Sequence, residues 1–233
     1  MMTRSRPAPS YACALAGLAA AWILALGASH STPTLPTADS VLAELKAGNS
    51  RHVKHAYTHP HLSADRRTEL AKGQEPHAVI LACADSRVAP EIVFDKGLGD
   101  LFTVRVAGNI AGDAEIASME YAVEHLHTPL IVVMGHQSCG AVKAAIDGGN
   151  APGHLPTLIL AIQPAVERAR GETGDLATNA VRDNVERVVD RLRSSHPILA
   201  EAVRAGKLRI VGAVYSLDSG AVTWLPDQRT AAK

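Results

Sequence analysis

Short apolar runs alternate with amphipathic stretches along this chain. Four runs are short and largely apolar, and they span residues 78–82, 101–106, 130–134 and 208–214. Continuous runs of this kind, rich in Val, Ile and Leu, are typical of strands that are covered on both faces, as in a parallel sheet. We therefore expect four buried strands.

The segments between these runs carry helical patterns. The clearest spans 181–192, where five apolar residues face away from the charged ones: Val181, Val185, Val188, Val189 and Leu192. Residues 116–126 and 158–170 follow the same period, although Pro164 either kinks the second helix or marks a first turn. The dipeptide His196-Pro197 should end the helix before it.

An earlier helix is predicted near residue 39. Thr37 and Asp39 supply capping oxygens, and apolar residues recur behind them at near-helical spacing: Val41, Leu42, Leu45 and Val53. Strands that alternate with helices predict an α/β domain. We expect three layers, with a mainly parallel central β-sheet flanked by helices, plus an N-terminal helical arm.

The first 29 residues resemble an export signal. Arg4 and Arg6 precede the apolar stretch 11–26, and small residues follow it. We predict a cleavable signal peptide over 1–29 and a periplasmic or secreted protein without a stable membrane anchor. The alternative is an anchor, for which the apolar stretch is short against the roughly 20 residues of a membrane span. A linker (30–38), one domain (39–226) and a tail (227–233) follow.

Composition argues against a nucleic-acid partner. The chain has 23 basic and 23 acidic residues, and aromatic residues make up only 3%. Loss of Arg4 and Arg6 with the leader leaves 21 − 23 = −2. A phosphate backbone demands a basic surface, and base stacking demands aromatic side chains.

Two fragments with metal-binding residues follow two of the predicted strands. They read Cys-Ala-Asp-Ser-Arg at 83–87 and Gly-His-Gln-Ser-Cys-Gly at 135–140. Ligand sites of parallel sheets lie at the carboxyl ends of the strands, so the two fragments can meet. Thiolate and imidazole suit zinc, and three protein ligands leave one position open in a catalytic site. Cys83, His136 and Cys139 are the predicted ligands of one Zn²⁺.

Asp85 and Arg87 allow two states of such a site. Either Asp85 takes the fourth position on the metal, or Arg87 holds the carboxylate away and water binds there. One alternative is a structural zinc with Asp85 as its permanent ligand. A second alternative is a disulfide between Cys83 and Cys139 in an exported protein, because Cys13 would leave with the leader.

A second metal site is conceivable among four histidines that lack acidic or thiol companions: His52, His55, His59 and His61. We favour solvated histidines.

The paired fragments, with Ala-Lys-Gly-Gln at 71–74 and Leu-Phe-Thr-Val-Arg-Val-Ala-Gly-Asn at 101–109, resemble the β-class carbonic anhydrases. The resemblance covers about 41–224 and implies reversible hydration of carbon dioxide by zinc-bound hydroxide. It implies that Cys83, His136 and Cys139 bind zinc and that Asp85 and Arg87 form the catalytic dyad. It also implies a homodimer or tetramer and these residues at the substrate: Gln74, Phe102, Ala107, Tyr121 and Gly140.

The chain departs from the family pattern at two positions. Ala84 and Val106 replace a serine and an asparagine, and neither change removes a ligand. Allosteric members carry a tryptophan where this chain has Ile80, so we predict a plant-like, open and non-allosteric site. Hydrolysis of carbon disulfide or carbonyl sulfide and a non-catalytic zinc protein remain alternatives.

Overall fold

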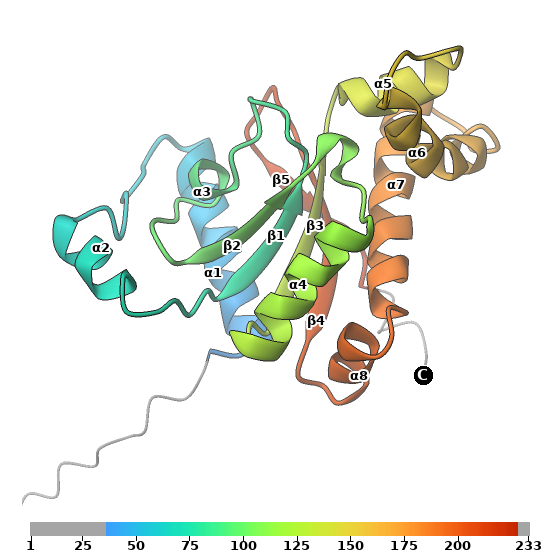
Figure 1. Cartoon of the computed structure of the whole chain (residues 1–233). Coiled ribbons are helices and arrows are strands. Elements are labelled where there is room, and N and C mark those ends of the chain that lie inside the picture. The colour runs from blue at the N-terminus through green and yellow to red at the C-terminus, as the bar shows by residue number, and fades with distance from the viewer. Residues whose placement is uncertain (1–35, 228–233) are drawn as a thin grey trace, which may run out of the picture. The chain divides into compact units, whose positions relative to one another are not determined.

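A five-stranded sheet lies at the centre of the protein (Figure 1). The computed structural model describes residues 36–227. The strand order is β2-β1-β3-β4-β5, and all neighbours are parallel except the pair β4 and β5. The strands are β1 (Ala78–Ala82), β2 (Leu101–Arg105), β3 (Leu130–His136), β4 (Arg209–Tyr215) and β5 (Val222–Trp224). The four predicted strands are confirmed, and the short antiparallel β5 is an addition to them.

Helices cover both faces of this sheet, as Figure 1 shows. Alternate residues of β1 pack against the helices on opposite faces of the sheet, because successive side chains of a strand point to opposite faces. Ile80 packs on the side of α1 (Ala38–Val53), and Val79 and Leu81 pack on the side of α4 (Asp113–His125). The three-layer α/β fold is therefore confirmed.

Helix boundaries fall close to those expected. The Thr37 side chain caps α1 by accepting a hydrogen bond from the Ser40 N–H, so the helix begins inside the predicted linker. Pro164 lies within α6 and not in its first turn. The other helices are α2 (Ala64–Leu70), α3 (Pro90–Val93), α5 (Gly140–Asp147), α6 (Leu155–Ala169), α7 (Leu176–Arg193) and α8 (Ile198–Arg204), with a 3₁₀ turn η1 (Ala107–Asn109).

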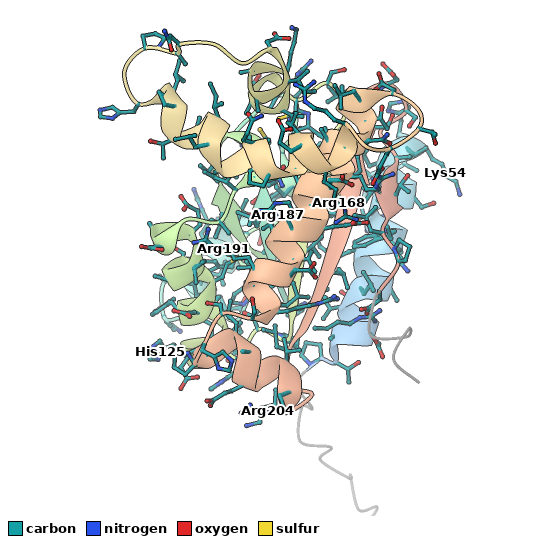
Figure 2. The ribbon with its side chains drawn as sticks, turned by 90° about the vertical axis from the view of Figure 1, so that its right-hand side faces the viewer. Lys54, His125, Arg168, Arg187, Arg191 and Arg204 are labelled. Atoms are coloured by element: carbon teal, nitrogen blue, oxygen red, sulfur yellow. The ribbon has the colours of Figure 1, made fainter. Side chains whose placement is uncertain are left out.

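The long helix α7 packs on the sheet, and α6 crosses it (Figure 2). Arg187 and Arg191 are exposed on α7, whereas Arg168 of α6 reaches across to Glu186, with 2.9 Å between Arg168 Nη2 and Glu186 Oε2. Buried apolar residues of α5, α6 and α7 form a cluster that also includes the side chains of Cys83 and Cys139. The fold thus places both sulfurs in an apolar layer between the sheet edge and three helices.

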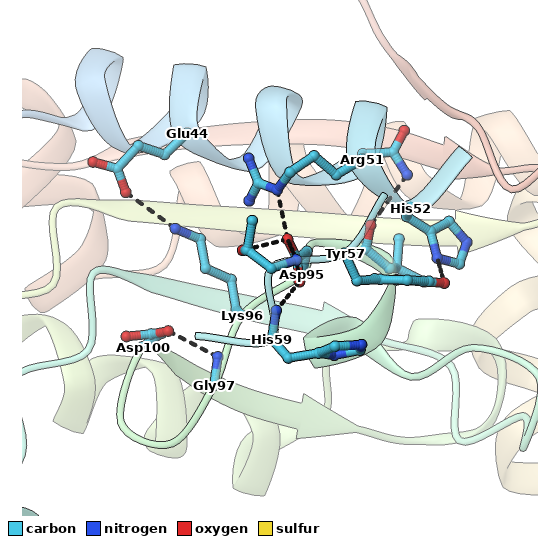
Figure 3. A network of polar contacts seen from close by, with 12 residues as sticks. Glu44, Arg51, His52, Tyr57, His59, Asp95, Lys96, Gly97 and Asp100 are labelled. Carbon is cyan, nitrogen blue, oxygen red and sulfur yellow. Dashed lines mark hydrogen bonds and ion pairs between the residues drawn. The ribbon is translucent and has the colours of Figure 1, made fainter. Parts of the chain in front are cut away.

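Asp95 ties the end of α1 to the loop that follows it (Figure 3). Its buried carboxylate accepts hydrogen bonds from Arg51, from the N–H and hydroxyl of Thr58, and from the His59 N–H. Burial alone would raise the pKa of Asp95, but these bonds outweigh it and hold the pKa well below its usual range. Helix α1, the predicted N-terminal arm, is therefore held on the rest of the domain by an ionised side chain.

The expectation of solvated histidines is wrong for His52. Its ring is half-buried, with Nδ1 2.7 Å from the Tyr57 hydroxyl and Nε2 3.1 Å from the Tyr215 hydroxyl. His61 pairs with Asp100, whereas His55 and His59 have exposed side chains. Within residues 36–227 these histidines form no metal-binding group.

The predicted signal peptide, most of the linker and residues 228–233 lie outside the described part of the chain. Among residues 36–227, no helix combines the length and the hydropathy needed to cross a membrane.

Candidate active site

Three predicted metal ligands meet at the carboxyl edge of the sheet. Cys83 follows β1, His136 ends the neighbouring β3, and Cys139 directly precedes α5. Their ligand atoms all lie within 4.8 Å of one another, and all three side chains are buried. Adjacent parallel strands thus bring together residues that are far apart in the sequence.

The geometry of this group fits a tetrahedral metal ion. The sulfurs of Cys83 and Cys139 are 4.0 Å apart, and two bonds of about 2.3 Å at a tetrahedral angle would span about 3.8 Å. His136 Nε2 is buried without a hydrogen-bond partner, while Nδ1 lies 2.9 Å from the Gln137 carbonyl oxygen. That contact makes Nδ1 the protonated nitrogen and leaves Nε2 a lone pair for a metal.

The sulfurs of Cys83 and Cys139 are close enough to affect each other's ionisation. The hydrogen bond from Cys139 lowers the pKa of Cys83 to about 4, whereas that same contact, together with burial, raises the pKa of Cys139. Both are free cysteines, so the described residues contain no disulfide between them. One thiolate beside one thiol is a site that a divalent cation can complete by displacing the remaining proton.

Asp85 and Arg87 form a two-pronged ion pair beside these ligands. Arg87 Nε donates to Asp85 Oδ1 over 2.9 Å, and Arg87 Nη2 donates to Oδ2 over 2.6 Å. These bonds hold the pKa of Asp85 well below its usual range, so its carboxylate is ionised. Asp85 Oδ2 also lies 3.8 Å from His136 Nε2. The carboxylate is thus next to the metal position while both of its oxygens are bonded to Arg87.

Two of the five predicted substrate residues lie beside the ligands. Ala107 precedes Gly108, whose backbone N–H donates to Cys83 Sγ over 3.3 Å. Gly140 follows Cys139, is exposed, and has no atom within 4 Å of the place where a Cβ would be. Within the described residues, a side chain at position 140 would therefore meet no packed neighbour.

The other three predicted substrate residues lie elsewhere in the chain. Phe102 and Tyr121 pair with ring centroids 6.4 Å apart at the outer strand β2, and Tyr121 is 48% exposed. Gln74 is exposed and lies before the amino end of β1. Gln74 lies beside Leu98 and Gly99, which precede β2, whereas Cys83 follows the carboxyl end of β1. These three roles stay predictions.

Sequence reasoning missed several groups that support the site. Arg105, at the end of β2, donates from Nε to the Cys83 carbonyl over 3.1 Å and from Nη2 to the Asp85 carbonyl over 2.6 Å. Asn184 of α7 donates to the carbonyl of Gly108 over 2.8 Å. No local sequence signal marks these contacts, because the partners lie 20 to 22 and 76 positions apart.

Comparison with known proteins agrees with this geometry. The family model described as carbonic anhydrase matches residues 78–222. "Carbonic anhydrase 2" of Mycobacterium tuberculosis (strain CDC 1551 / Oshkosh) is 43% identical over 192 residues, covering 80% of this chain and 93% of that protein. "Carbonic anhydrase" of Mycolicibacterium smegmatis is 40% identical over 194 residues, covering 81% and 94%.

Solved structures show the same fold. The β-carbonic anhydrase CcaA has a TM-score of 0.63 and 28% identity, covering 79% of this chain and 95% of that one. A tetrameric β-carbonic anhydrase from Sordaria macrospora has a TM-score of 0.64 and 27% identity, covering 81% and 98%. With the Cys-His-Cys group in place at the sheet edge, these similarities show that the chain belongs to the β class of the carbonic anhydrase family.

Proposed function

We propose that this protein catalyses the reversible hydration of carbon dioxide to bicarbonate and a proton. We propose further that it does so with one Zn²⁺ per chain on Cys83, His136 and Cys139. The observation that carries the proposal is the convergence of two sulfurs and an unpartnered imidazole nitrogen within 4.8 Å, beside an ionised carboxylate. Two thiolates and one imidazole suit zinc better than the harder divalent cations.

Zinc in such a site lowers the pKa of water in its open position and so supplies a nucleophile near neutral pH. Residues of the chain then orient the attacking oxygen. Asp85 Oδ2, 3.8 Å from His136 Nε2, is placed to accept a hydrogen bond from the attacking oxygen. Arg87 keeps that carboxylate ionised and occupied, so that it leaves the fourth position open. A structural zinc would need no such competitor for Asp85.

The substrate pocket is proposed to form between two subunits. Ala107 and Gly140 flank the ligands of one chain, whereas Gln74 and the pair of Phe102 and Tyr121 lie away from them. A second copy that presents its Gln74, Phe102 and Tyr121 would complete the pocket in a homodimer or tetramer. The Sordaria macrospora relatives are described as tetrameric, which supports this arrangement.

The test is stopped-flow hydration of carbon dioxide by the zinc-loaded protein and three variants. Activity should be lost in Cys139→Ser and should fall by at least about 100-fold in Asp85→Ala, within the range for a removed acid–base group. Asp147→Ala, which removes an exposed carboxylate paired with Lys143, is the matched control and should retain parent activity. A folded parent that binds zinc and remains inert would instead favour a non-catalytic zinc protein.

The pH dependence offers a second check. Two of the three ligands are thiolates, which donate more charge to the metal than imidazoles and weaken its action on bound water. We therefore expect the hydration rate to rise on the alkaline side of neutrality. A rate that is flat between about pH 6 and pH 9 would count against thiolate ligation of the catalytic metal.

An exported location is also proposed, on the strength of the basic and apolar residues before position 30. Cell fractionation with N-terminal sequencing should find a mature protein that begins after about residue 29 in the periplasm or medium. Cytoplasmic protein that retains Arg4 and Arg6 would overturn the proposal.

A further inference from the structure

Asn184 is a buried amide on the core-facing side of α7. It is 2% exposed, and its neighbours on the same side of the helix are Val181, Val185 and Val188, all of them buried. A polar side chain among valines is unfavourable unless it is hydrogen-bonded, and an apolar residue would pack as well. The position therefore requires a specific partner for the amide.

That partner is the backbone of the turn beside the metal ligands. Asn184 Nδ2 donates to the Gly108 carbonyl over 2.8 Å. Gly108 is the central residue of η1 and has a φ of 72°, a left-handed conformation that favours glycine. A Cβ at Gly108 would lie 2.6 Å from Ile162 Cδ1, so α6 closes on the turn from another side. Two helices thus hold η1 in one conformation.

The same glycine contacts a predicted metal ligand. Its N–H donates to Cys83 Sγ over 3.3 Å, so the amide of Asn184 and the sulfur of Cys83 are joined through a single residue. Groups that hydrogen-bond a metal ligand fix its orientation and adjust the charge that it donates. A substitution at Asn184 should therefore change the binding of the metal, although Asn184 is not itself one of the ligands.

We infer that Asn184 is a positioning residue for the metal site, which fixes the Gly108 turn so that its N–H stays on the sulfur of Cys83. This inference rests on the proposed zinc function. It assigns to α7 a role beyond covering the sheet, because the helix determines how much charge Cys83 gives to the ion.

Cobalt substitution of the full-length protein tests the inference, since Co²⁺ bound to thiolate shows a charge-transfer absorption band. A hydrogen bond stabilises the sulfur lone pairs, so its loss should move the band to longer wavelength. We expect this shift in Asn184→Leu and Asn184→Asp, together with a Co²⁺ dissociation constant about tenfold higher, at the low end for groups that orient metal ligands. Asn184→Asp keeps the shape of the side chain and decides the question should Asn184→Leu fail to fold.

Asn179→Leu is the matched control. Asn179 is also a buried amide of α7, 7% exposed, and donates to the Thr173 carbonyl over 3.1 Å, away from the Gly108 turn. It should lower stability without moving the cobalt band. The inference is overturned by an Asn184→Asp protein with the parent's band and affinity, or by an equal shift in Asn179→Leu. A parent that binds Co²⁺ with thiolate bands but does not hydrate carbon dioxide would defeat only the proposed function, and a parent that binds no Co²⁺ would defeat both.

Discussion

Individual residues at this site depend on main-chain contacts as much as on side-chain chemistry. Arg87 fixes the orientation of the Asp85 carboxylate through two hydrogen bonds. Arg105 in turn fixes the backbone of the loop that carries Asp85, because it donates to the carbonyls of Cys83 and Asp85. A guanidinium has several donors in a rigid plane, so one side chain can fix two carbonyls at once. Arg105 is thus placed to fix the backbone that carries a predicted ligand, Cys83, and the predicted catalytic carboxylate of Asp85.

Replacement of Arg105 by methionine should therefore impair activity more than folding. Methionine keeps the apolar stem but loses both hydrogen bonds, each worth about 1.5–3 kcal/mol when one partner is charged. Loss of one such contribution in the transition state lowers kcat/KM by roughly tenfold or more. Stopped-flow assays at matched zinc content would measure this effect.

Arg204→Met is the control for this substitution. Arg204 is exposed and its guanidinium lies 4.0 Å from Glu201, a surface contact of little energetic value. Both variants should keep the circular dichroism spectrum of the parent. A kcat/KM equal to that of the parent in Arg105→Met would show that Arg105 does not support catalysis.

The convergence of Cys83, His136 and Cys139 could be predicted from the sequence, whereas the side chains that support them could not. Cys83, His136 and Cys139 follow apolar runs, and the edge of a parallel sheet gathers such residues. Arg105 was part of a predicted strand, and Asn184 was hidden among valines of an amphipathic helix. Their partners lie 20 to 22 and 76 positions away, and only tertiary packing determines which backbone carbonyl they meet.

Among the elements, the N-terminal arm shows best how a buried charge fastens one segment to another. The pairing of α1 with the Thr58 loop depends on Asp95, whose side chain is 1% exposed. Sequence patterns predicted α1 through its cap and its apolar residues. They missed the attachment of His52 to Tyr57 and Tyr215, since an amphipathic pattern reports burial but not the partner.

Asp95→Asn should destabilise the protein by about 3 kcal/mol, because it leaves the half-buried Arg51 without its carboxylate. Since the folded-state pKa of Asp95 is depressed, its contribution is present above the unfolded value of about 3.9 and is lost as the pH falls. The difference in unfolding free energy between parent and variant should be constant above about pH 5 and should shrink below about pH 4. Urea denaturation across this pH range would measure it.

Glu44→Gln is the control for this prediction. Its partner Lys96 lies 3.1 Å away (Figure 3), but the Glu44 side chain is 53% exposed, so the cost of the substitution should stay below about 1 kcal/mol. Equal losses in Glu44→Gln and Asp95→Asn would show that Asp95 is not the anchor of the arm.

Within one chain, the residues predicted to form the substrate pocket lie at two separate places. The predicted metal ligands lie at the carboxyl ends of β1 and β3, and Gln74 lies before the amino end of β1. If the pocket forms between subunits, each metal site uses the Gln74 of another chain. The two groups of residues can then be separated by mutation.

Mixed oligomers provide the test. We expect Gln74→Ala and Cys139→Ser each to reduce activity when assembled alone. Hybrids refolded from both variants should recover activity, because the metal of the Gln74→Ala subunit meets the intact Gln74 of its Cys139→Ser neighbour. Since half of the subunit pairs in an equal mixture of dimers are hybrids, recovery should be roughly a quarter of parent activity. Hybrids no more active than the average of the two variants would place Gln74 in its own chain's site or outside any site.

The most direct measurement is a titration of metal-free protein with Zn²⁺, followed by the rate of carbon dioxide hydration. We expect no hydration above background without metal, a linear rise as zinc is added, and a plateau at about one equivalent per chain, the stoichiometry of a single Cys-His-Cys site. Removal of zinc by a chelator should abolish the activity, and added zinc should restore it. Protein that takes up one equivalent of zinc and remains inactive, or that is active without metal, would contradict it.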